Sequence, residues 1–258
     1  MKNLLLILLA CFTFSAFGQT LLSVETDLVT KYQRIDYWSK HSSEENVARV
    51  DSLEKSNQAF QTALLRYTSS YPASLTSAFK ALQAEGVTIA SSGDGLLRIY
   101  SWDTQTGGTM HFFANVYQYK AGSTVYSTVL PASEEGDPGV WYSKIYRLPY
   151  QEKPIYLAIE HAIFSSKDCY EGIKAFRITN RSLNDTVKII RTKSGIKNVL
   201  GFAYNFFSVM DRKERPVELI AYNGAQKAIR IPVVSEDGTV TAKPLVYQFT
   251  GQYFERVK

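Results

Sequence analysis

A change of residue pattern at Gly86 constrains the fold of this chain more than any other feature. Before Gly86, apolar residues recur at intervals of three and four, whereas β-branched and aromatic residues dominate after it. Turn sequences such as Asn223-Gly224 and Asp237-Gly238 then arrive roughly every 11 to 19 residues, as in a series of hairpins. Helical patterns are missing between these strands, so parallel βαβ units are not expected. The pattern therefore predicts an α+β fold whose second part is antiparallel.

Residues 19–86 are expected to be a helical region. One stripe of apolar residues indicates a first helix, and a second stripe indicates an amphipathic helix of about 25 residues that ends at Tyr71-Pro72. Ser43 is expected to begin the second helix, and Asn57 is the polar position in its stripe. Ser74 is expected to cap a short third helix that Gly86 closes. Two long helices with a short link should form an antiparallel hairpin.

Residues 87–258 are expected to be an antiparallel β domain on which the helical hairpin packs. About twelve strands would form a large β-meander, and that many strands curl or split rather than stay one open sheet. A sandwich or a barrel-like closure both remain open. A partial propeller is less favoured, because no unit recurs at a fixed period.

The first eighteen residues have the layout of a secretory signal peptide. Lys2 precedes an apolar run, and small residues at Ala16 and Gly18 suit cleavage before Gln19. The run is too short to span a bilayer comfortably, so we expect no transmembrane span after signal removal. Residues 8–11 resemble a bacterial lipobox, which leaves lipid anchoring through Cys11 as the less favoured alternative. We expect a secreted or periplasmic protein of the bacterial cell envelope.

Charge and cysteine content limit the classes of partner and of scaffold. The formal net charge is +5 and the pI is about 9.0, but the basic residues are dispersed along the chain. Nucleic-acid binding needs basic residues gathered on one face, so it is not expected. Cys169 would be alone in the mature chain, which excludes an intramolecular disulfide. A buried small hydrophobe is the favoured interpretation of Cys169, over a reactive thiol.

The hairpin over residues 96–120 supplies the candidate ligand-binding residues. With Trp102 opposite Thr109 and Tyr100 opposite His111, the apolar faces of both strands coincide. The opposite face then combines aromatic and polar side chains: Arg98, Tyr100, Trp102, His111, Asn115 and Tyr117. Two explanations compete for this face. Either the N-terminal helices cover it, or it is an open platform on which sugars stack.

No recognised catalytic or metal-binding motif is present in the sequence. The nucleophile elbow, the His-Glu-x-x-His pair, paired cysteines, calcium loops and phosphate loops are all missing, so we expect no cofactor and no metal. Carboxylates at turns, namely Asp94, Asp103, Asp137 and Asp168, suit local hydrogen bonding there. Two of them could still meet in space, as glycoside hydrolysis requires.

These observations favour an exported cell-envelope protein that is a non-enzymatic binding or scaffold module. Its expected partner is a glycan or another envelope protein, and its oligomeric state stays open. The alternative is a glycan-acting hydrolase with dispersed carboxylates.

Overall fold

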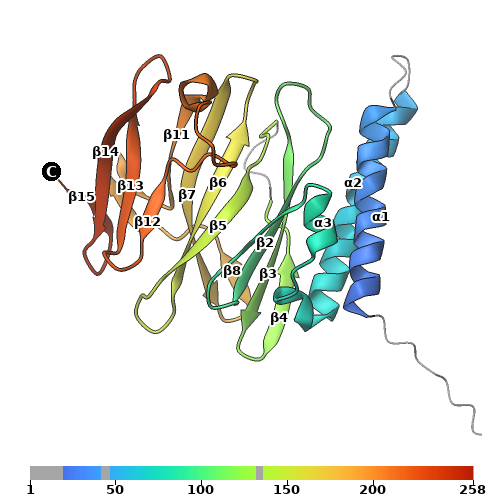
Figure 1. The fold of residues 1–258 in the computed structure, drawn as a ribbon. Helices are drawn as coiled ribbons and strands as arrows, with labels where there is room; N and C mark the ends of the chain where they lie inside the picture. Colours follow the sequence, from blue (N-terminus) through green and yellow to red (C-terminus); the bar gives the residue numbers. More distant parts are fainter. Residues whose placement is uncertain (1–19, 42–46, 132–135, 258) are drawn as a thin grey trace, which may run out of the picture.

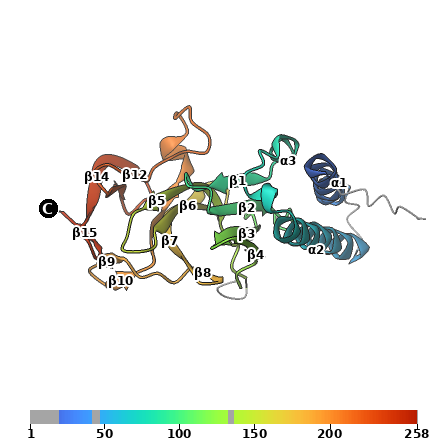
Figure 2. The same ribbon diagram turned by 90° about the horizontal axis from the view of Figure 1, so that it is seen from below.

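The computed structural model describes residues 20–41, 47–131 and 136–257. The leader expected over residues 1–18, the lipid site at Cys11 and the helix start at Ser43 lie outside these ranges. The described chain forms four layers, in which one layer of helices is followed by three stacked β-sheets (Figure 1). Figure 2 shows the same succession from below, with the helices at one end and β14 and β15 at the other.

The helical layer contains the predicted hairpin. Helix α1 spans Leu21–Lys40 and α2 spans Val47–Ser70, and the two pack side by side in opposite directions (Figure 1). Thr20 caps α1, since its side chain accepts a hydrogen bond from the Ser23 backbone N–H at 3.2 Å. The predicted apolar stripe of α1 is buried, with Val24, Leu28, Tyr32 and Ile35 as its core.

The third helix differs from the prediction at its start. Residues Pro72–Leu75 form a 3₁₀ helix, η1, and the α-helix α3 begins only at Lys80 and ends at Ala84. Phe79 separates the two with a φ of 43°, in the left-handed region, so a helix cannot run through it. Ser74 does not cap α3, because its buried hydroxyl donates to the Tyr71 carbonyl and accepts from the Gln118 amide at 2.8 Å. Gly86 ends α3 with a φ of 111°, as expected.

The three sheets are open and stacked, so the sandwich alternative is correct and the barrel is not. The helix-side sheet has the order β1-β2-β3-β4, and the middle sheet has the order β11-β7-β6-β5 with β8 paired to β7. The outer sheet has the order β10-β9-β15-β14-β13-β12.

The strands of the helix-side sheet are β1 (Thr88–Ser91), β2 (Leu97–Asp103), β3 (Phe113–Ala121) and β4 (Thr124–Thr128). Those of the middle sheet are β5 (Trp141–Leu148), β6 (Ile155–Ile163), β7 (Asp168–Thr179), β8 (Ser182–Asn184) and β11 (Val199–Asn205). A second 3₁₀ helix, η2 (Phe206–Val209), follows β11. The outer sheet contains β9 (Ile190–Thr192), β10 (Gly195–Lys197), β12 (Ala221–Asn223), β13 (Ala228–Val234), β14 (Val240–Phe249) and β15 (Phe254–Arg256).

The described residues form fifteen strands rather than about twelve, and one pair is not antiparallel. Five of the fifteen strands are three residues long, too short for an alternating pattern to reveal. Strand β15 pairs in parallel with β9, and it lies between β9 and β14 in the outer sheet.

The middle sheet is buried on both faces, which explains the stacking. Tyr156 and Ala158 of β6 pack in the cluster shared with the helix-side sheet. Leu157 and Ile159, which alternate with them, pack in the cluster shared with the outer sheet. A third cluster joins α1 and α2 to β2 and β3. None of the described helices combines the length and apolarity needed to cross a bilayer.

Candidate functional site

The register of the β2–β3 hairpin differs from the predicted one. Trp102 lies opposite Ala114 and Tyr100 opposite Val116, instead of Thr109 and His111. The pairing is therefore displaced along the second strand by an odd number of residues, and an odd displacement turns every side chain of that strand to the other face. The physical cause is a loop over residues 104–112 that is longer than the expected turn. The six candidate residues consequently do not share one face.

Trp102 faces the helices and is buried beneath them. Its indole N–H donates to the Asn57 side-chain oxygen at 3.1 Å, and its ring meets Phe60 edge-on with the centroids 5.0 Å apart. This part of the predicted platform is therefore covered by α2, as the packing explanation requires.

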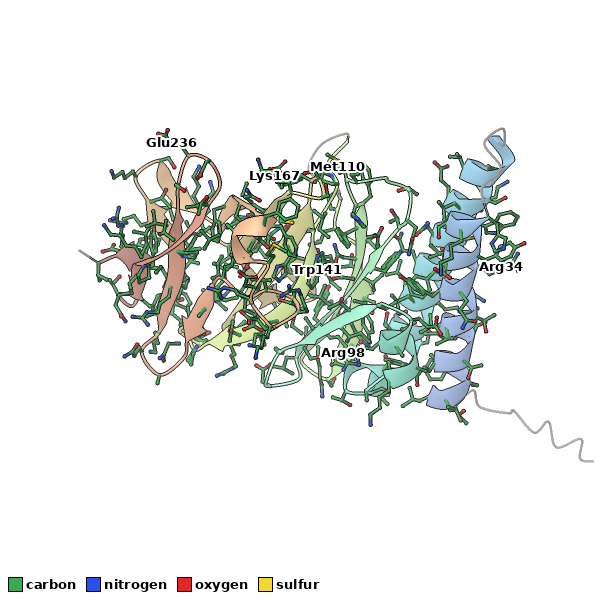
Figure 3. All side chains as sticks on the ribbon, turned by 45° about the horizontal axis from the view of Figure 1, so that its top comes forward. Arg34, Arg98, Met110, Trp141, Lys167 and Glu236 are labelled. Carbon is green, nitrogen blue, oxygen red and sulfur yellow. The ribbon has the colours of Figure 1, made fainter. Side chains whose placement is uncertain are left out.

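Arg98 and Tyr100 lie on the same covered face, and their polar atoms are engaged by the chain. The Arg98 guanidinium donates to the carbonyl oxygens of Ser74 at 2.7 Å and Ser77 at 2.6 Å. The Tyr100 hydroxyl lies 3.0 Å from the Gln118 side-chain oxygen. Arg98 lies beside the helical layer in Figure 3. Both residues hold the segment after α2 onto the sheet.

His111 lies in the loop before β3 rather than on a strand. Its Nδ1 is 2.5 Å from the Asp103 carboxylate, and its backbone N–H donates to the Ile163 carbonyl at 3.0 Å. It is separated from Trp102 by the end of β2, so it does not extend the covered face.

Asn115 and Tyr117, on the opposite face of β3, line a cavity of about 540 Å³ between the helix-side and middle sheets. We call this cavity the inter-sheet pocket. Residues from α2, β3, β5, β6, β7 and β11 line it, together with the loops before β5 and β11. Its polar side chains include Asn115, Tyr117, Asp137, Tyr142, Glu160, Lys174, Asp185 and Asn198.

A buried carboxyl group, that of Glu160 on β6, is part of the pocket lining. The Tyr170 hydroxyl donates to Glu160 Oε1 at 3.2 Å, and the Tyr142 hydroxyl also hydrogen-bonds to this carboxyl. Tyr117 continues the chain of hydroxyls, with its oxygen 3.4 Å from that of Tyr142. Burial raises the pKa of Glu160, and the positive charge of Lys174 opposes that shift. The carboxyl is thus held in place by tyrosines.

Two cross-strand glycines make room for Tyr170. Gly172 on β7 pairs with Gly201 on β11. A Cβ atom added to Gly172 would lie 2.5 Å from the Tyr170 hydroxyl oxygen, and one added to Gly201 would lie 2.2 Å from it. Only glycine therefore lets the tyrosine lie across these strands and reach Glu160.

The rim of the pocket carries a cation paired with a carboxylate. Lys174 Nζ lies 2.9 Å from Asp185 Oδ2, and the Asn198 amide donates to the Asp185 carbonyl at 2.9 Å. The Asn115 amide donates to Val140 and its oxygen accepts from Ser101, which orients the side chain. These groups are positioned before any ligand arrives.

The carboxylates expected at turns make turn hydrogen bonds, and Asp137 also reaches the pocket. Asp137 accepts from the Gly139 N–H at 2.8 Å, Asp94 from the Leu96 N–H at 3.2 Å, and Asp168 from the Ser165 hydroxyl at 2.9 Å. Asp103 accepts from the Gln105 N–H and pairs with His111.

The sequence did not reveal that Glu160 and Lys174 line the inter-sheet pocket, or that Tyr170 holds the Glu160 carboxyl in place. One available sign was Glu160 itself, a charged residue within the apolar run of residues 155–163. Glycines within predicted strands, such as Gly172 and Gly201, were a second sign, because they mark close approach of another group.

The neighbouring His161 points away from Glu160, as expected for adjacent residues on a strand. Its ring stacks on Trp141 with the centroids 4.3 Å apart, and its Nε2 lies 2.7 Å from the Ser143 hydroxyl. Burial lowers the pKa of His161 to about 4. Trp141 lies centrally in Figure 3, within the middle sheet. Cys169 is also buried, and burial raises the pKa of its thiol.

Within the described ranges, no group of three or more His, Cys, Asp or Glu side chains is arranged to hold a metal ion. Compared with protein-family models, curated proteins and solved structures, the chain matches none. The inter-sheet pocket is therefore interpreted from its own chemistry.

Proposed function

We propose that this chain is an exported protein that binds a hydroxylated ligand, a glycan fragment, in the inter-sheet pocket. The observation that carries the proposal is the pocket lining, which combines aromatic rings with amide, carboxylate and ammonium groups on strands and the loops next to them. Aromatic faces suit the C–H surfaces of a sugar, and paired donors and acceptors suit its hydroxyl groups. The volume of about 540 Å³ falls in the range of small-ligand sites.

Binding is favoured over catalysis because Glu160 is committed to the protein. Its carboxyl is engaged by Tyr170 and Tyr142 and is almost wholly buried, so it anchors the pocket lining. Export to the periplasm or the cell exterior is part of the proposal, and the layout of residues 1–18, which is typical of a secretory signal peptide, supports it. Lipid anchoring through Cys11 stays the alternative form of export.

Glycan-array screening of the mature chain, followed by calorimetric titration of the best oligosaccharide, tests the proposal. Lys174→Gln keeps the side chain polar but removes the rim cation, so affinity should fall by about tenfold. The matched control is Lys153→Gln. Lys153 lies in the exposed turn between β5 and β6 and does not line the pocket, so this variant should leave affinity unchanged. Absence of any oligosaccharide ligand, or equal affinity in both variants, would overturn the proposal.

Glycoside hydrolysis is the second candidate, because Glu160 and Asp137 line the same pocket and the charge of Asp137 helps raise the pKa of Glu160. Such enzymes use two carboxyl groups on either side of the scissile bond, and the one that acts as the acid has a raised pKa. Incubation of the bound oligosaccharide with the protein separates the two functions. New reducing ends that disappear in both Glu160→Gln and Asp137→Asn would favour the hydrolase over the binding protein.

A further inference from the structure

A second cavity, of about 940 Å³, runs beside the edge of the middle sheet where the chain passes from β10 to β11. One wall is formed by the β9–β10 hairpin together with β14 and β15 of the outer sheet. The other wall is formed by Tyr170 and the first residues of β11. We call this cavity the basic groove, because Arg191, Lys193, Lys197 and Arg256 line it.

Positive charge in the basic groove is only partly neutralised. Glu255 is the acidic residue in the lining, and it pairs with Arg191 at 3.3 Å. Within the described ranges, Lys193, Lys197 and Arg256 form no ion pair, and all three are exposed. Three cationic side chains are therefore available to an anion in the same concave surface.

We infer that the basic groove binds an anionic polysaccharide, a sugar polymer that carries carboxylate or sulfate groups. The hydroxyls of Thr192 and Ser194 line the groove beside the cations and can accompany the ring hydroxyls of a sugar. A bilayer surface is flat and would not follow a concave groove between two sheets. A polymer strand can lie along it and place successive anions near Lys193 and Lys197.

This inference rests on the groove alone and does not require the inter-sheet pocket to bind a glycan. Val199 lines both cavities, but each cavity otherwise has its own lining residues. A competing account is that lysines beside an open strand edge only discourage pairing with another chain. That account predicts that the groove binds no polysaccharide, and that replacing these lysines with glutamate changes no binding measurement.

The test uses polygalacturonate and dextran sulfate as anionic probes, with neutral dextran and polyglutamate for comparison. The full mature chain should bind the anionic polysaccharides, with affinity that falls as salt rises, and should not bind dextran. Lys193→Glu/Lys197→Glu should reduce that affinity by at least about tenfold. The matched control, Lys153→Glu/Lys213→Glu, changes the net charge equally at exposed sites outside the groove and should reduce it less than about twofold.

Equal losses in the two double variants would overturn the inference, because binding would then follow net charge alone. Equal affinity for polyglutamate would also overturn it and would point to an acidic peptide instead. The pocket proposal has its own readout, which is titration of Lys174→Gln with the oligosaccharide identified on the array. Failure of the pocket proposal and failure of the groove inference can thus be told apart.

Discussion

Glu171 on β7 carries a fully buried carboxyl group, and no lysine or arginine in the described part of the chain forms an ion pair with it. Its oxygens accept hydrogen bonds from the backbone N–H groups of Leu219, at 3.0 Å, and Ile220, at 2.7 Å. Burial raises the pKa of Glu171 to about 7, and the two N–H donors act in the opposite direction. The residue thereby holds the segment before β12 against the middle sheet.

Glu171→Gln should remove a pH dependence of stability. Because the folded-state pKa is raised, the stabilising effect of protonation is present below the unfolded pKa of about 4.5 and is lost as pH rises through about 7. This shift corresponds to about 3 kcal/mol of unfolding free energy, and glutamine does not titrate. Urea unfolding at several pH values across this interval should show the variant gaining on the parent protein as pH rises.

The control for this prediction is Glu236→Gln, at an exposed turn, which should leave the pH profile unchanged. His161 contributes a slope of opposite sign, since its lowered pKa makes stability fall as pH falls from about 6.5 towards 4. That slope is common to all three proteins and cancels in their differences. Parallel profiles for the parent and Glu171→Gln would contradict the prediction.

Among the elements, α2 is joined to the sheet by the polar position in its apolar stripe. Asn57 accepts from the Trp102 indole at 3.1 Å and donates to the Thr104 carbonyl at 2.9 Å. Asn57 is the polar residue in the otherwise apolar stripe that the sequence predicts for this helix. The structure explains it, because its side chain links the helix to the end of β2 by hydrogen bonds.

Asn57→Ala should lower the free energy of unfolding by about 2–4 kcal/mol. The substitution removes the partner of the Trp102 N–H and of the Thr104 carbonyl, and each of these part-buried groups should cost about 1–2 kcal/mol, the lower part of the range for unsatisfied buried groups. Gln58→Ala, on the exposed side of the same helix, controls for helix propensity and should change stability by less than about 0.5 kcal/mol. If Asn57→Ala lowered the free energy of unfolding no more than Gln58→Ala does, the prediction would be wrong, and water would have to replace both hydrogen bonds.

Elements with long periodic patterns were predictable from the sequence, and features that depend on tertiary contacts were not. The stripes of α1 and α2 and the strands after Gly86 follow from side-chain periodicity. The register of β2 with β3 does not, because both strands alternate and several pairings bring apolar faces together. Ser74 is an N-cap by local rules, but Gln118 from β3 draws its hydroxyl into the core.

The candidate site could be predicted only in part for the same reason. Asn115 and Tyr117 were found, yet the displaced register moved them away from Trp102 and into the inter-sheet pocket. Glu160 and Lys174 come from other strands and meet them only when two sheets stack. No local pattern in the sequence encodes which sheets become neighbours.

At the scale of the whole molecule, each inner sheet face belongs to a core that two layers share. Phe60 packs between the helices and β2, Phe176 between the helix-side and middle sheets, and Phe254 between the middle and outer sheets. Separating any two layers would expose apolar surface, which disfavours partly unfolded states. The four layers should therefore unfold together.

Phe60→Ala and Phe254→Ala test this cooperativity from opposite ends of the stack. Both side chains are fully buried, so each substitution should cost about 3–5 kcal/mol and should lower the same unfolding midpoint. Tryptophan fluorescence reports on the helices, the helix-side sheet and the middle sheet through Trp38, Trp102 and Trp141, whereas far-ultraviolet circular dichroism reports on all layers. Coincident transitions by both probes are expected in both variants. If Phe254→Ala shifted the dichroism transition and left the fluorescence transition in place, the outer sheet would be an independent unit and the shared middle sheet would not couple the layers.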